Sequence, residues 1–175
     1  MSDGPYSNVS ACEMGLPEQE WRRTSTTIRL EHECTHYFTL RVFGSMRNNI
    51  LDELIADYAG ITAAGRYRAD WFMRFMGLEA FPAYREGGRL QNYRGEPPLS
   101  GGAFRVLQGL VKDAAENLGR LDSDPAYLPG RKTEDLAGTL LALTGFSLEE
   151  LAAPEAPGRI LRAVRREREK LRRAG

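Results

Sequence analysis

The sequence predicts a mainly α-helical fold with little or no β-sheet. Two observations lead to this prediction. Apolar residues recur at helical spacing along most of the chain, and the strict alternation of apolar and polar residues that is typical of strands is scarce. The chain has 175 residues, of which 42% are apolar and 27% are charged. It is therefore long enough to bury a core and polar enough to be soluble.

The N-terminal part of the chain is expected to be mainly loop. Residues 1–16 are rich in Gly, Pro, Ser and Asn, and Pro17 is suited to open a short helix. The β-branched run 24–28 is ambiguous, because it fits either an edge strand or the first turn of the next helix. We predict that this next helix covers about 26–43 and ends at Gly44.

Further helices are predicted from apolar spacing, caps and glycine stops. Asn48 or Asn49 is expected to cap the second one, and residues 147–150 form a capping box for a later turn. The other predicted helices cover 68–79, a stretch that starts at Ser100, 133–145 and 156–173.

Both histidines of the chain lie in one stretch, His32-Glu33-Cys34-Thr35-His36, which reads H-E-x-x-H. If the residues of this chain were arranged at random, the pattern would occur in about one arrangement in a thousand. Residues i and i+4 of a helix lie on one face about 6 Å apart, so the two imidazoles can bind one metal ion. A catalytic Zn²⁺ takes three protein ligands, and no third histidine exists here.

A second, acidic motif offers the missing ligand. Glu53 follows His36 by seventeen residues, and Asp57 follows one helical turn later. On a helix antiparallel to the first, Glu53 completes a His-His-Glu site, while Asp57 accepts the outer N–H of a ligating histidine. Asp52 is the alternative third ligand. The alternative interpretation of the acidic pair is a solvated face of an amphipathic helix.

The two motifs resemble those of the gluzincin metallopeptidases, specifically the thermolysin-like pattern His-Glu-x-Thr-His followed by Glu-x-x-x-Asp-x-x-Gly. The match is limited to residues 28–61. The resemblance implies a zincin-like helical domain, one Zn²⁺ per chain and cleavage of a peptide or protein substrate. It implies that His32, His36 and Glu53 bind the zinc ion. It also implies that Glu33 is the general base and that Asp57 orients one of the zinc-bound histidines.

Two departures from that family matter. No histidine remains to stabilise an oxyanion, so a tyrosine or arginine has to replace it; the candidates are Tyr58, Tyr67, Tyr84, Tyr93 and Arg94. Only 31 residues precede the motif, too few for the β-sheet that aligns substrates in such peptidases. Three explanations remain open: a missing N-terminal segment or a partner chain that completes the cleft, a minimal protease with a different cleft, or a metal site that does not cleave peptides.

The segment 82–102 is a candidate substrate-covering loop. Loops longer than about 15 residues are usually functional or disordered. If this one folds over the metal, an arginine or tyrosine in it could serve the oxyanion role. Its polar and aromatic residues are Tyr84, Arg85, Arg89, Gln91, Tyr93 and Arg94.

The C-terminal helix is basic, with eight basic and two acidic residues, although the whole chain has a formal net charge of 0. Such a helix can attract nucleic acid. Its apolar stripe, which includes Ile160 and Val164, favours packing on the rest of the protein. The alternative function is therefore a non-catalytic helical module that binds metal structurally, or binds a partner or nucleic acid.

Other features concern the cellular context. The absence of a long apolar run and of a charged-then-apolar leader predicts neither a membrane span nor a secretory signal and favours the cytoplasm. Cys12 and Cys34 are expected to be free thiols, and Cys34 points away from the histidine face.

The sequence divides into three parts. Residues 1–25 are an N-terminal loop region, residues 26–155 are a helical metal-binding domain, and residues 156–175 are a basic helix.

Overall fold

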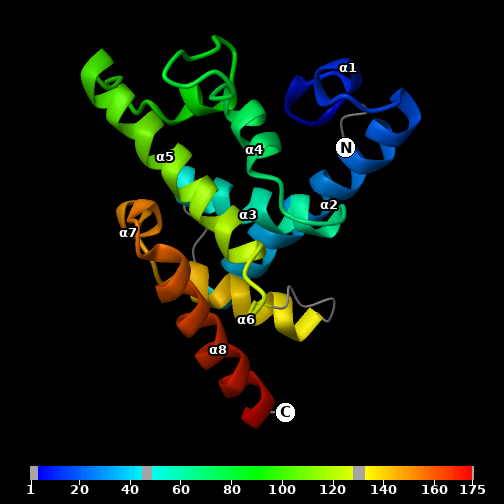
Figure 1. Ribbon diagram of the computed structural model, residues 1–175, viewed down its shortest axis with the longest axis vertical. Helices are drawn as coiled ribbons and strands as arrows, with labels where there is room; N and C mark the ends of the chain where they lie inside the picture. The colour runs from blue at the N-terminus through cyan, green and yellow to red at the C-terminus, as the bar shows by residue number, and fades with distance from the viewer. Residues whose placement is uncertain (1–3, 45–48, 128–132, 175) are drawn as a thin grey trace.

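The computed structural model describes residues 4–44, 49–127 and 133–174, and within these ranges it contains helices and no β-strand. The prediction of a mainly α fold is confirmed (Figure 1). The elements in chain order are η1 Tyr6–Asn8, α1 Ala11–Met14, α2 Glu18–Phe43, α3 Ile50–Ala63, α4 Ala69–Met76, η2 Arg89–Tyr93, α5 Gly101–Asp122, α6 Thr133–Leu143, α7 Leu148–Ala152 and α8 Ala156–Ala174.

Helix α2 is longer than predicted. It begins at Glu18, so the helix predicted to open at Pro17 is confirmed but continues into the motif helix, and the strand considered over 24–28 is wrong. The loop expected over the N-terminal residues is interrupted by η1 and α1. The β-branched run is accommodated because Thr26 and Thr27 hydrogen-bond back to carbonyls four residues earlier. The helix ends at Gly44, as predicted, in the left-handed conformation (φ 66°) that favours glycine.

Helix α3 packs directly against α2, as the sequence predicts for the two motif-bearing helices. Its N-cap is Asn49, whose side chain accepts a hydrogen bond from the backbone N–H of Asp52; Asn48, the other predicted cap, lies outside the described residues. The helices are in close contact at Gly60, where a Cβ atom would lie 2.6 Å from the carbonyl oxygen of Ile28. Only glycine fits this contact.

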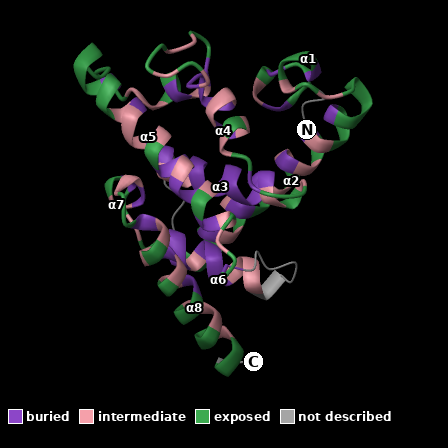
Figure 2. Ribbon diagram, viewed as in Figure 1, coloured by how far each residue is buried: buried purple, intermediate pink, exposed green. Residues whose placement is uncertain are grey.

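The hydrophobic core is centred on α3, where buried residues gather between the surrounding helices (Figure 2). Every residue from Glu53 to Ile61 is buried, because α2, α4, α5 and α6 all contact this helix. The largest fully buried side chains are Trp21, Tyr58, Phe72 and Phe75. A helix that is covered on all sides holds its polar residues rigidly, which matters for the site below.

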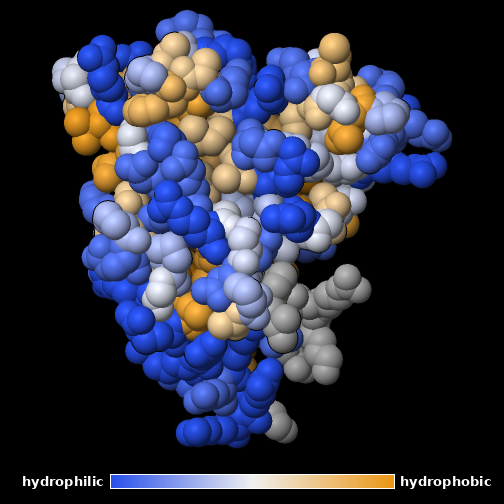
Figure 3. Space-filling view, viewed as in Figure 1, coloured by the Kyte–Doolittle hydropathy of each residue, from blue (hydrophilic) through white to orange (hydrophobic). Residues whose placement is uncertain are grey.

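The C-terminal helix α8 packs against α6 and α5 through the predicted apolar stripe, with Ile160 and Val164 buried. Its polar side gives the end of the molecule opposite the N-terminal segment a strongly hydrophilic surface (Figure 3). Ser147 forms the predicted capping box with Glu150 ahead of α7. No helix within the described ranges has both the length and the apolar content needed to cross a membrane.

The segment between α4 and α5 is ordered rather than a flexible connection. It contains the 3₁₀ helix η2, and Arg85 fixes it to α4 by donating to the carbonyl of Arg74 (2.6 Å). Arg85 also pairs with Glu79 (2.5 Å) within the segment. Its backbone passes so close to α4 that a Cβ atom on Gly88 would lie 2.4 Å from the carbonyl oxygen of Met76. The backbone of the segment therefore has a fixed position against α4, and so do the side chains attached to it.

Candidate metal centre

Two packed helices bring three predicted ligands together. His32 and His36 lie one turn apart on α2, and Glu53 faces them from α3. The two Nε2 atoms are 3.0 Å apart, Nε2 of His36 is 3.4 Å from Glu53 Oε1, and Nε2 of His32 is 3.7 Å from Glu53 Oε2. One ligand atom from each of the three side chains lies within 4.8 Å of the other two, and the side chains come from two packed helices.

These separations fit a tetrahedral zinc ion. Zinc–nitrogen and zinc–oxygen bonds of about 2.0–2.2 Å imply distances of roughly 3.3–3.6 Å between neighbouring ligands. The observed values of 3.0, 3.4 and 3.7 Å lie around that range, with His36 nearer to Oε1 of Glu53 and His32 measured to Oε2. Within the described ranges, His32, His36 and Glu53 are the only cluster of three or more histidine, cysteine or acidic side chains close enough to share an ion. Asp52, the alternative ligand, is not part of it.

The carboxylates of the site are held ionised. Burial alone would raise the pKa of Glu53, but its hydrogen bond with His36 and the nearby charge of Arg89 outweigh burial and lower it. Asp57 is completely buried, and the charge of Arg89 together with a hydrogen bond from His32 likewise lowers its pKa. The hydrogen bond to Glu53 in turn raises the pKa of His36. The site therefore offers negative charge to a cation.

Asp57 lies where the sequence predicts, behind a histidine. Its Oδ1 atom is 2.8 Å from Nδ1 of His32. An ionised carboxylate only accepts hydrogen bonds, so the ring proton belongs on Nδ1 and the lone pair of Nε2 faces the other ligands. This is the tautomer that metal binding requires.

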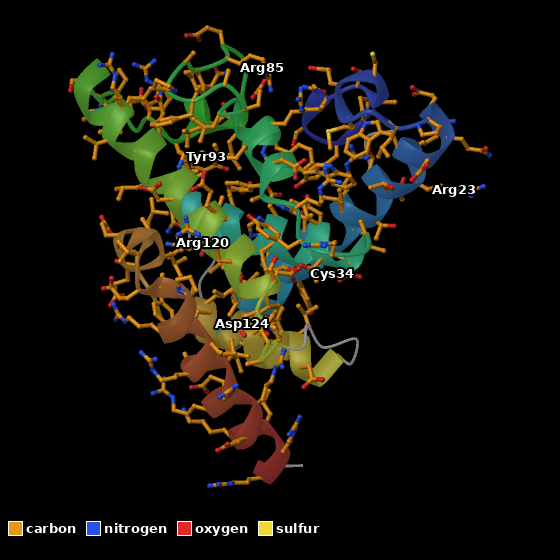
Figure 4. The ribbon with its side chains drawn as sticks, in the orientation of Figure 1. Arg23, Cys34, Arg85, Tyr93, Arg120 and Asp124 are labelled. Carbon is orange, nitrogen blue, oxygen red and sulfur yellow. The ribbon has the colours of Figure 1, made fainter. Side chains whose placement is uncertain are left out.

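Glu33 lies on the exposed side of α2 next to the ligands. Its negative charge contributes to the raised pKa of His36, so the carboxylate is within electrostatic range of the site. Cys34 is exposed and free, and so is Cys12, as expected. Figure 4 shows Cys34 on α2 and Tyr93 on the segment that precedes α5.

Among the oxyanion candidates, Tyr93 is the one whose pKa responds to the ligand Glu53. Burial, together with the negative charge of Glu53, raises the pKa of Tyr93, which keeps the phenol protonated. The remaining candidates make other contacts. Tyr58 is buried with its hydroxyl on Tyr127, Tyr67 is buried, Tyr84 donates to Gly88, and Arg94 lies over the ring of Phe104.

Sequence reasoning missed two residues that touch the site, Tyr6 and Arg89. The hydroxyl of Tyr6 is 2.8 Å from Nδ1 of His32, and Arg89 pairs with both Glu53 and Asp57. Arg89 belongs to the segment considered as a candidate substrate-covering loop, so its region was indicated although its role was not. No pattern in the sequence pointed to Tyr6.

The described residues form a helical protein in which a cluster of His32, His36 and Glu53 lies between two packed motif helices. The chain belongs to a family of unknown function (DUF7005), whose model matches residues 1–155. No curated protein and no solved structure matches the chain. Inferences about activity therefore rest on the chemistry of the site.

Proposed function

We propose that this protein is a zinc-dependent hydrolase, and specifically a peptidase that resembles the gluzincins. The observation that carries the proposal is the convergence of His32, His36 and Glu53 at distances that suit tetrahedral zinc, with Asp57 fixing the tautomer of His32. A surface cluster of acidic residues would not combine burial, two imidazoles and an outer carboxylate.

The chemistry divides among a few groups. Zn²⁺ at this centre would supply a Lewis acid and lower the pKa of water. We propose Glu33 as the general base, which takes a proton from the attacking water and delivers it to the leaving amine. Its exposure to solvent supports this role. We propose that Tyr93 donates its O–H to the carbonyl oxygen as negative charge develops there, because its pKa is raised.

A peptide substrate is supported by the surface beside Glu33. Leu30 and Tyr37 lie three residues before and four residues after it, on the same side of α2, and their exposed fractions are 48% and 64%. Exposed apolar side chains at such positions can contact the side chains of an extended peptide. Because no described residue forms a strand, the substrate cannot be aligned by an edge strand of the described part of the chain, and we propose that α2 itself provides this surface.

Metal content is the first test. Protein purified without chelators or metal-affinity resin is expected to hold about one zinc per chain by elemental mass spectrometry, and Glu53→Ala is expected to lose it. Glu33→Gln should retain the zinc and lose about 10²–10⁴-fold in peptide cleavage, because only proton transfer is removed. Absence of zinc in zinc-replete protein would refute the proposal, and full turnover by Glu33→Gln would refute the general base.

A structural metal is the second candidate function, and the burial of the ligands favours it. The side chains of His32 and Glu53 are only 8% and 11% exposed. The two functions respond differently to chelation. A hydrolase should lose activity without unfolding and regain it with zinc, whereas a structural centre should lose helix content, measured by circular dichroism, when the metal is removed.

A further inference from the structure

Two side chains from separate segments enclose the outer side of His32, and neither belongs to the motif helices. Tyr6 comes from η1 in the N-terminal segment, and Arg89 comes from η2 between α4 and α5. We infer that Tyr6 and Arg89 are positioning residues, which hold Asp57 and His32 in the arrangement that metal binding requires. This inference rests on the proposed metal centre.

The hydroxyl of Tyr6 is the meeting point of the arrangement. It donates to Asp57 Oδ1 (2.5 Å), accepts from Nη1 of Arg89 (2.9 Å) and lies 2.8 Å from Nδ1 of His32. A phenol has one proton, and the ionised carboxylate is the group that can only accept it. The oxygen of Tyr6 can therefore accept a hydrogen bond from the Nδ1–H of His32, as Asp57 Oδ1 also does. Neither neighbour points a proton at Nδ1, so the proton of His32 stays on that nitrogen.

Arg89 fixes the carboxylates. One of its terminal nitrogens, Nη2, binds Asp57 Oδ2 and lies 3.5 Å from Glu53 Oε2, so a single guanidinium spans the outer carboxylate and the ligand carboxylate. Its central carbon also lies 5.2 Å from the ring centre of Tyr6. A completely buried carboxylate such as Asp57 needs this compensation, because unpaired buried charge is strongly disfavoured.

The backbone after Tyr6 supports the inference. Ser7 and Asn8 both have positive φ, 54° and 56°. Asparagine tolerates this conformation, but for Ser7 it is unfavourable and persists where surrounding contacts impose it. The imposing contacts are the hydrogen bond from Tyr6 N–H to Ser25 (3.2 Å) and the one from Trp21 to the carbonyl of Val9 (2.7 Å). The unfavourable backbone conformation therefore lies directly after Tyr6, the residue whose hydroxyl contacts the site.

The substitutions Tyr6→Phe and Arg89→Lys test this role, with zinc affinity measured by competition with a chromophoric chelator. We expect both to weaken zinc binding by about ten- to a hundredfold, as for other outer partners of a metal-ligating histidine. The matched controls are Tyr58→Phe, which removes a buried tyrosine hydroxyl bonded to Tyr127, and Arg85→Lys, which alters an ion pair of the same segment. Neither control should change the affinity.

Nitrogen-15 spectra of the histidine side chains give a readout that a loss of stability alone would not move. The chain has only two histidines, so the signals are readily assigned. In metal-free wild type and in both controls, His32 should be the Nδ1–H tautomer, and in Tyr6→Phe and Arg89→Lys it should become a mixture. If both variants bound zinc like wild type and kept a single tautomer, the inference would be overturned while the metal centre stood. If wild type itself bound no zinc, the proposed function would fail instead.

Discussion

Two buried polar networks link the helices of this protein, and they are built from different chemistry. The metal-centre network, which consists of Tyr6, His32, His36, Glu53, Asp57 and Arg89, contains two carboxylates, two imidazoles, a guanidinium and a single phenol. A second network, called here the tyrosine network, ties α3 to α6 and α8 mainly through hydroxyl groups. Its members are Tyr58, Tyr127, Thr139 and Arg168.

The hydroxyls of the tyrosine network are paired with one another, while Arg168 also donates to the carbonyl of Asp135. The hydroxyls of Tyr58 and Tyr127 are 2.7 Å apart, Tyr127 and Thr139 are 3.3 Å apart, and Arg168 donates to Thr139 at 3.2 Å. Nothing in it converges on a point that a ligand could fill. In the metal-centre network, by contrast, Nε2 of two imidazoles and the oxygens of a carboxylate face one another. Buried polarity alone therefore does not mark a site; convergent lone pairs on ionisable groups do.

Removing one member from each network should give the largest contrast. Asp57→Ala leaves Arg89 without its main partner, which we expect to cost about 3 kcal/mol in the free energy of unfolding and to weaken zinc binding ten- to a hundredfold. Tyr127→Phe should cost about 1 kcal/mol and leave zinc binding unchanged. Urea unfolding and zinc competition measure the two quantities.

Two results would change this comparison. Unchanged zinc affinity in Asp57→Ala would reduce that carboxylate to an ordinary acidic residue of α3. If Asp57→Ala did not fold, Asp57→Asn would separate the effects, since it keeps the volume of the side chain and removes the charge.

The contact between α2 and α3 can be tested at glycine. Gly60→Ala would put a Cβ atom 2.6 Å from the carbonyl oxygen of Ile28, one turn before His32, so the two helices must move apart. We expect a loss of about 1–3 kcal/mol in unfolding free energy together with weaker zinc binding. Gly109→Ala, on α5, is the matched control, because a Cβ atom there meets nothing within 4 Å. It should stabilise the protein by up to about 1 kcal/mol. Equal unfolding free energies for the two variants would show that the absence of a side chain at Gly60 does not set the distance between α2 and α3.

The part of the site that was predictable from the sequence is the part set by single helices. Spacing along one helix fixes which face a side chain occupies, so the two histidines, and separately Glu53 and Asp57, follow from local geometry. The start of α2 was missed because a β-branched run obscured it. The signal that favours one continuous helix is the apolar spacing of Trp21 and Ile28, seven residues apart and both buried.

The contacts that were not predictable join distant segments. Tyr6 meets Asp57 across 51 positions and Arg89 across 83. Neither residue has a local pattern that marks it, since a tyrosine in a loop-like segment and an arginine among several others are common. Their placement depends on how the N-terminal segment and η2 pack on α2 and α3, which is tertiary information.

The smallest expected effect is on the pH dependence of folding in the metal-free protein. The folded-state pKa of Glu53 is lowered, so its contribution to stability is complete above its unfolded value of about 4.3 and is lost as the pH falls through the folded value. The folded-state pKa of His36 is raised, so its contribution is complete below about 6.5 and is lost as the pH rises through the folded value.

The stability that wild type holds over Glu53→Gln should therefore be greatest between about pH 4.5 and 6.5 and decline on both sides. Urea unfolding of metal-free protein at pH 4, 5.5 and 8 measures it. In Tyr127→Phe, which touches neither group, the difference from wild type should be independent of pH over this range, because no shifted carboxylate or imidazole is altered. If the difference in unfolding free energy between wild type and Glu53→Gln were also independent of pH, the Glu53–His36 pair would contribute nothing to the folding of the metal-free protein. The arrangement would then stabilise the protein only when a cation is bound.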